Sequence, residues 1–168
     1  MDAEEIQRQF DEVCDQGIVY HGYVDYMRDY AIYVYCTADP KTGIAPETVR
    51  LLFKNCVVAS IETALTVETW QRSLDDRLID YTTGVDLDGY VWGVKWQLMY
   101  PGGTVLSDSP IASQWSASLG VIFHEAHIKT NGHNMVLVFT DLVSTVVEPG
   151  HSPFTVDVSG PEFKVPWG

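Results

Sequence analysis

The stretch VIFHEAHIKTNGHNMVLVFTDLVSTVV, residues 121–147, decides the fold of this chain. Apolar and polar residues alternate on both sides of Asn131-Gly132, a dipeptide that strongly favours the two-residue turn of a β-hairpin. We therefore expect strands over residues 121–130 and 133–147, paired antiparallel. A tight turn between two such strands indicates a sheet built from antiparallel neighbours.

A two-residue loop also sets the register of this hairpin. The expected pairs are Ile128 with Met135, Ala126 with Leu137, and His124 with Phe139. Because side chains alternate between the faces of a strand, His124 falls on the apolar face, and His127 falls on the other face beside Glu125 and Lys129. A metal held by both rings needs them on one face, as in the histidine pair of a zinc-protease helix. The sequence therefore predicts a hydrogen-bonded core histidine at 124, a surface histidine at 127, and no metal site.

The rest of the chain carries further strand and helix patterns. Alternation predicts strands over residues 18–23, 30–37, 49–53, 57–66 and 90–100, with a short one over 154–158. Helical spacing predicts helices over 3–16, 67–81 and 110–119. The expected fold class is α+β, mainly an antiparallel β-sheet of about six to eight strands with two or three helices. A length of 168 residues without a linker favours a single domain over 1–168, with a partly irregular tail over 148–168.

Local signals place several boundaries. Asp2 is expected to cap the first helix and Gly17 to end it, and Ser107 or Asp108 is expected to cap the helix over 110–119. The strand over 30–37 is apolar on both faces, which predicts a central position with cover on both sides. Asn55 is expected to form a bend or bulge.

Two segments of the chain resemble one another. Residues 51–61, LLFKNCVVASI, align with residues 137–147, LVFTDLVSTVV, and a polar residue interrupts both at the same place. A duplicated hairpin explains this similarity, and so does the shared patterning of unrelated amphipathic hairpins. The sequence leaves both explanations open.

The charge of the chain narrows the classes of partner. Asp and Glu number 23 against 10 Lys and Arg, a formal net charge of −13. Such a surface repels nucleic-acid phosphates and anionic membranes, and it attracts a basic protein partner. Solubility alone is the other explanation of the acidity. An acidic start, no apolar run of membrane-spanning length and three cysteines without paired spacing favour a cytoplasmic protein.

Two groups of residues are candidates for a site. The acidic side chains of the helix over 67–81 form a candidate contact face for a basic partner, namely Glu68, Asp75, Asp76 and Asp80. The aromatic strand over 90–100 and two histidines form a candidate pocket, namely His21, Trp92, Trp96 and His124. The aromatic residues also fit a packed core, and the acidic ones also fit a solvated helix face.

The chain lacks recognised catalytic and cofactor motifs. It contains no Gly-x-Ser-x-Gly elbow, no Ser-x-x-Lys and no phosphate-binding Gly-x-x-x-x-Gly-Lys sequence. Asp86-Leu87-Asp88-Gly89 resembles the start of a calcium loop, but Gln97 stands where that loop needs a bidentate Glu. No catalytic residue and no cofactor is therefore predicted, and an enzyme is the less favoured class.

Several short stretches resemble a known family. They are YHGYVDYMRDY at 20–30, RLIDY at 77–81, DGYVWGVKW at 88–96 and TNGHN at 130–134. Together they are similar to the YxiG-like family of bacterial proteins, over about residues 6–147. The family has no established activity and no defined functional residues. Its association with a polymorphic-toxin locus implies an immunity-type role.

Three functions follow from these observations. The first is a non-enzymatic binding protein of the immunity type that neutralises a basic toxin domain. The alternative is a small-molecule-binding protein or an enzyme whose cleft uses the aromatic strand and a histidine. The third is a subunit of an assembly, which a large exposed apolar patch would favour. The partner and the oligomeric state are left open.

Overall fold

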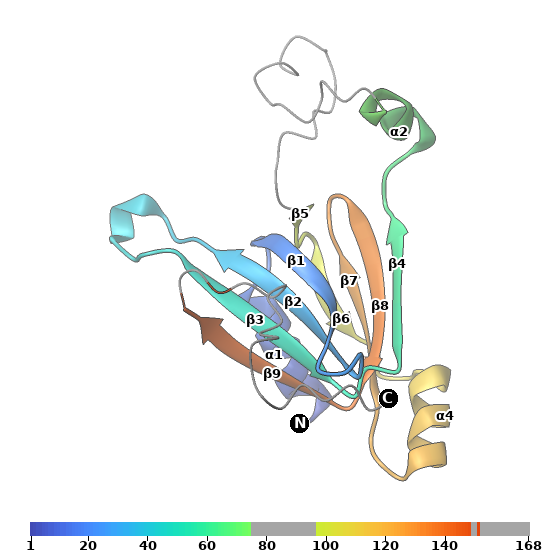
Figure 1. Ribbon diagram of the computed structural model, residues 1–168. Helices are drawn as coiled ribbons and strands as arrows, with labels where there is room; N and C mark the ends of the chain where they lie inside the picture. The colour runs from blue at the N-terminus through green and yellow to red at the C-terminus, as the bar shows by residue number, and fades with distance from the viewer. Residues whose placement is uncertain (75–96, 149–150, 152–168) are drawn as a thin grey trace, which may run out of the picture.

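The computed structural model describes residues 1–74, 97–148 and 151, and these ranges form two antiparallel sheets (Figure 1). The first sheet has five strands in the order β5 (Gln97–Leu98), β1 (Gly17–Val24), β2 (Asp29–Cys36), β3 (Glu47–Lys54), β9 (Asp141–Val147). The second has four in the order β4 (Val58–Thr63), β8 (His133–Phe139), β7 (His124–Lys129), β6 (Gly102–Val105). The predicted α+β class is confirmed, with nine strands in the described ranges.

Two long strands cross from one sheet to the other and join them. The chain leaves the first sheet at the end of β3 and enters the second as β4, and it returns from β8 to the first sheet as β9. The two crossing strands pair with each other in both sheets, Lys54 with Asp141 in the first and Val58 with Val138 in the second. The prediction of one strand over 133–147 was therefore wrong, because the chain changes sheet at Thr140.

The similarity of residues 51–61 and 137–147 has a structural counterpart. Each segment contains the crossing, and the two run antiparallel beside one another along their length. Leu51, Phe53, Leu137 and Phe139 all face the space between the sheets and are fully buried. The two segments therefore share an apolar pattern because each of them buries one strand face in the first sheet and one in the second.

The hairpin register predicted from Asn131-Gly132 is confirmed. Ile128 pairs with Met135, Ala126 with Leu137, and His124 with Phe139. The loop is held by the Thr130 hydroxyl, which accepts from the backbone N–H groups of Gly132 at 3.0 Å and of His133 at 2.8 Å. The tip also binds the first sheet, because the Asn131 side chain accepts from the N–H of Leu98 at 3.0 Å.

Helix α1 (Ala3–Glu12) lies beside the first sheet and packs on β6 and β9 (Figure 1). Asp2 caps it as predicted and accepts from the N–H of Glu5 at 2.8 Å. The helix ends at Glu12, earlier than predicted, and Gly17 opens β1. Ile6 and Phe10 are buried, and the ring of Phe10 occupies the place that a Cβ of Gly103 would take.

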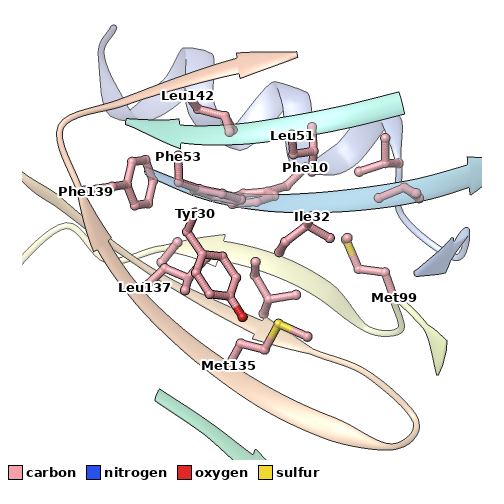
Figure 2. Close-up of a cluster of buried hydrophobic side chains, with 14 of the residues drawn as sticks. Phe10, Tyr30, Ile32, Leu51, Phe53, Met99, Met135, Leu137, Phe139 and Leu142 are labelled. Atoms are coloured by element: carbon pink, nitrogen blue, oxygen red, sulfur yellow. The ribbon is translucent and has the colours of Figure 1, made fainter. Parts of the chain in front are cut away.

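The core lies between the two sheets and α1. Figure 2 shows its large side chains meeting from both sheets and the helix. Phe53 contacts Phe139 edge-to-face, with ring centroids 4.8 Å apart, and Phe10 at 6.1 Å. β2 is central in the first sheet, as predicted, with Ile32 and Val34 in this core and Ala31 and Tyr33 in a smaller cluster on the outer face.

Three further elements complete the described chain. They are α2 (Val67–Ser73), α4 (Pro110–Leu119) and a 3₁₀ turn, η1 (Pro40–Thr42). Helix α4 has the predicted bounds, but its cap is Ser109, whose hydroxyl accepts from the N–H of Ala112 at 2.9 Å, rather than Ser107 or Asp108. Asn55 forms the predicted bend, with φ of 49°. In the described ranges no helix is both long and apolar enough to cross a membrane.

Several predicted elements lie partly or wholly outside the described residues. Of the aromatic strand over 90–100 only Gln97–Leu98 is a described strand, and the predicted strand over 154–158 lies outside the described ranges. The second helix is described over Val67–Ser73. β6 was not predicted, because Pro101-Gly102-Gly103 was expected only to end the strand over 90–100. The glycines are instead needed where Cys14 and Phe10 approach β6 closely.

Candidate functional site

Helix α4 and the loop that follows it carry exposed apolar residues in a regular pattern. Three residues at four-residue spacing on the helix and two in the loop form what we call the α4 face: Ile111, Trp115, Leu119, Val121 and Ile122. Their exposed fractions run from 36% for Trp115 to 73% for Ile122. The helix itself carries no charged residue. Exposed apolar residues grouped on one helix and its following loop are typical of a contact site for another protein.

Helix α4 reaches this position because its opposite side is anchored to the second sheet. Ala112 packs with Phe123 and Val138, and Trp115, the least exposed residue of the α4 face, also lies against this side, with its ring 6.2 Å from that of Phe123. In Figure 1 the helix stands at the edge of the molecule, beside the chain segment that joins β3 to β4. The anchoring side is narrow, so most of the helix surface is left open to solvent.

A polar network holds the start of α4 against β7. The Ser109 hydroxyl caps the helix and donates to the Glu125 carboxylate, and His127 Nε2 lies 2.7 Å from the other oxygen of Glu125. Burial acts to raise the pKa of Glu125, but the bonds from Ser109 and His127 outweigh it and the pKa is lowered. Glu125 therefore stays ionised and fixes the helix start. His127 is 40% exposed, as a surface histidine was expected to be.

A hollow of about 450 Å³ adjoins the α4 face. Leu119 and Val121 belong to both the face and the hollow, whose other lining residues are Arg28, Asn55, Cys56, Val57, Phe123 and Thr140. The Arg28 guanidinium is 57% exposed and pairs with the buried carboxylate of Asp29 through Nε at 3.1 Å. The hollow is thus mainly apolar with one cation at its side. It can accept an apolar side chain from a partner that rests on the α4 face.

His21 lies in a different part of the molecule, on β1 beside the tip of the β7–β8 hairpin. Its Nδ1 is 2.7 Å from the Tyr30 hydroxyl, and burial together with the neighbouring His133 lowers the pKa of His21. Burial raises the pKa of Tyr30, so the phenol stays protonated. Gln97 binds His133 Nδ1 at 2.6 Å and lines a hollow of about 240 Å³ with His21.

The two histidines of the predicted pocket lie near opposite ends of the β7–β8 hairpin. His124 is the first residue of β7, and its ring lies 6.2 Å from that of Phe139, whereas His21 lies near His133 at the tip. Burial lowers the pKa of His124, against a hydrogen bond with the Met1 backbone. The placement on the core side agrees with the predicted face. Trp92 and Trp96 lie outside the described residues.

The predicted acidic contact face falls mostly outside the described residues. Glu68 is exposed in the first turn of α2, where a bond from its own backbone N–H and one from Thr66 lower its pKa. Asp75, Asp76 and Asp80 lie outside the described ranges. Within the described ranges, no group of three or more His, Cys, Asp or Glu side chains is arranged to hold a metal ion.

Sequence reasoning missed the α4 face although its signal was present. Ile111, Trp115 and Leu119 are spaced four residues apart, which is typical of a helix side buried against the core. The structure turns this side outward because the small Ala112 and the following Phe123 make the contact with the sheet. The signal that identifies the face is a helix that is apolar on more than one side and has no charge.

These features define a class: an α+β protein of two antiparallel sheets, joined by crossing strands, that presents an uncharged apolar helix to solvent. The chain belongs to the YxiG-like protein family, whose sequence profile matches residues 2–157. The match extends past Glu148, where the sequence resemblance was expected to end. No curated protein and no solved structure matches the chain significantly.

Proposed function

We propose that this protein is a non-enzymatic binding protein of the bacterial cytoplasm that docks a basic protein partner on the α4 face. The observation that carries the proposal is the exposure of five large apolar side chains on and beside one uncharged helix, next to an apolar hollow. Trp115 and the hollow at Leu119 supply the aromatic anchor and the pocket that binding hot spots favour.

The charge of the chain supports a basic partner. A net charge of −13 raises the rate of encounter with a cationic protein, and the uncharged helix then makes the short-range contact without desolvating an ion. Glu68, Asp75, Asp76 and Asp80 stay a predicted second contact for the same partner. An immunity-type role, in which the partner is a toxin domain, agrees with the role that the family resemblance implies.

The test compares two variants with matched chemistry. Ile111→Gln with Leu119→Gln removes two exposed residues of the α4 face, and Ile44→Gln with Met27→Gln removes two apolar residues from loops elsewhere that are somewhat more exposed. Both variants are expected to keep the wild-type free energy of unfolding within about 0.5 kcal/mol, because the side chains are exposed.

Affinity capture from the native host with all three proteins then tests the site. We expect one basic protein that the wild type and the loop variant retain and that the α4 variant loses by about tenfold or more. Its association rate with the wild type should fall as salt rises. Equal recovery of that protein by the α4 variant would contradict the docking site, and recovery of no basic protein would contradict the function.

A further inference from the structure

The hollow of about 450 Å³ beside the α4 face has walls from segments that are far apart in the sequence. They are the turn between β1 and β2, the two crossings between the sheets, and the end of α4 with the loop that follows it. Figure 1 shows these segments meeting at the lower end of the molecule. The apolar side chains of the wall are Val57, Leu119, Val121 and Phe123. A volume of this size is within the range of small-molecule sites.

This hollow, which we call the Arg28 hollow, differs in charge from the rest of the molecule. Among the described residues that line it, Arg28 is the charged one, and no Asp or Glu is present. A second hollow of about 500 Å³, at the start of β3 and the end of β9, is lined by Glu47 and Glu148 and by no described cation. In a chain with a formal net charge of −13, a hollow with a cation and no acid favours an anionic ligand.

The Arg28 guanidinium keeps hydrogen-bond donors for a ligand. A guanidinium carries five N–H donors, and Arg28 uses Nε at 3.1 Å and Nη2 at 3.2 Å to bind the Asp29 carboxylate. Within the described part of the chain it makes no other hydrogen bond, so both N–H groups of Nη1 and one of Nη2 are left. This edge of the guanidinium can bind a second carboxylate with two parallel hydrogen bonds. The side chain is 57% exposed, so a ligand can reach it.

Asp29 orients Arg28 without cancelling the positive charge of the site. One carboxylate is shared by two cations, Arg28 and Lys54, which leaves this ion cluster with one excess positive charge. The Asp29 side chain has no exposed surface and also accepts from the Asn55 N–H at 2.8 Å, so its position is fixed. A guanidinium that is held in place before binding loses less conformational entropy when a ligand arrives.

We propose that the Arg28 hollow binds a small organic acid with an apolar body. The carboxylate accepts from Nη1 and Nη2 of Arg28, and the body packs on the apolar wall, including Leu119 and Val121. A monoanion matches the single excess charge of the cluster. The inference does not depend on the docking function, although Leu119 and Val121 belong to the α4 face as well. The titrations that test it contain no other protein, so the two proposals can fail separately.

The first test compares acids with a neutral molecule of the same shape. The probes are 3-phenylpropionate, octanoate and the uncharged 3-phenylpropanamide. We expect an acid at millimolar concentration to raise the Tm of the wild type, and the acid with the larger effect shows whether the preferred body is aromatic or aliphatic. The amide should bind about tenfold more weakly than 3-phenylpropionate, because it lacks the charge that strengthens the bonds from Arg28.

The second test removes the cation. Arg28→Gln should weaken binding of the acid about tenfold or more in a calorimetric titration. Asp29 keeps Lys54 and the Asn55 N–H as partners in this variant. Arg8→Gln removes an exposed arginine from α1 and should leave binding of the acid unchanged.

A further pair of variants keeps the test decisive if Arg28→Gln does not fold. Val121 is 49% exposed, so Val121→Ser should fold, and it should weaken binding of the acid several-fold because part of the apolar wall is lost. Val146→Ser changes a valine that is 62% exposed and lines the second hollow, so binding should be unchanged. The proposal is overturned if neither acid raises the Tm, if the amide binds as tightly as 3-phenylpropionate, or if a folded variant at Arg28 or Val121 binds the acid as the wild type does.

Discussion

The chain crosses between the two sheets twice, and the residues at the two crossings differ in their local chemistry. From β3 to β4 the chain takes three residues to change sheet, with Asn55 at a φ of 49° and Cys56 buried. From β8 to β9 it takes one, Thr140. The first crossing is tied to the start of β2, where Asp29 accepts from the Asn55 N–H at 2.8 Å. The second is tied to the first, through a bond from the Thr140 N–H to the Lys54 carbonyl at 2.9 Å.

This difference shows which crossing depends on a buried charge. The Asp29 side chain has no exposed surface, and it binds Arg28 and Lys54 as well as the Asn55 N–H. The corresponding acid of the second crossing, Asp141, is 42% exposed and pairs with the amino terminus of Met1. The two crossings therefore differ in their electrostatic energy although their sequences are similar, because only the first is built around a charged side chain that is removed from water.

The largest expected effect tests what the two crossings share. Phe53→Ala and Phe139→Ala each remove a fully buried ring of the same contact pair, so each should lower the free energy of unfolding by about 3–5 kcal/mol. The double variant should lose less than the sum, because the two cavities merge. Urea denaturation measures all three values. Val143→Ala, at a residue 39% exposed, is the control and should change stability by less than about 1 kcal/mol.

The next effect separates the crossings. Asp29→Asn keeps the size of the side chain but leaves two cations and a backbone N–H with a weaker partner, so it should cost about 2–3 kcal/mol. Asp141→Asn makes the same change at the second crossing and should cost less than about 1 kcal/mol, because that pair is exposed. Equal losses in urea denaturation would show that the buried charge does not distinguish the crossings.

The same pair of variants has a pH signature. Burial acts to raise the pKa of Asp29, but hydrogen bonds from Arg28, Lys54 and Asn55 lower it from 3.8 to about 2. Because the folded pKa lies below the unfolded one, the stabilisation of about 2 kcal/mol is present above pH 4 and is lost as the pH falls toward 2. Asp29→Asn should lack this part of the acid dependence of stability, and Asp141→Asn should retain it.

The smallest expected effect measures how the crossings depend on each other. Asn55 Nδ2 donates to Thr140 Oγ1 at 2.8 Å, the bond that links the two side chains at the crossings. Asn55→Gly keeps the left-handed backbone and removes this bond, and Thr140→Val removes it from the other side, so each should cost about 1 kcal/mol. A double-mutant cycle should give a coupling of about 0.5–1 kcal/mol. A coupling of zero would show that the crossings are independent.

The hairpin shows how far local sequence carries the prediction. Asn131-Gly132 and strict alternation gave the turn, the pairs and the face of His124, because a two-residue loop leaves one register. The helix bounds of α4 and the bend at Asn55 also follow from local propensity. The role of Gly103 inside β6 was not predicted, because the ring of Phe10 that requires a glycine there comes from a helix distant in the sequence.

The candidate sites depended more on tertiary structure. Nothing in the sequence indicates that Arg28 and Asn55 line the same hollow as Leu119 and Val121, because at least 64 residues separate the two pairs along the chain. The outward side of α4 could not be assigned from spacing, because an apolar stripe fits a buried and an exposed face equally well.

The sequence by itself determined the α+β class, the central β2, the β7–β8 hairpin with its register, and membership of a family through short motifs. These features rest on alternation, turn chemistry and local caps, which act over a few residues. Only the tertiary structure decided that the chain changes sheet at Asn55 and again at Thr140, and that α4 turns its apolar side to solvent. The physical reason is that sheet membership and burial depend on pairing between distant segments, which local patterns do not encode.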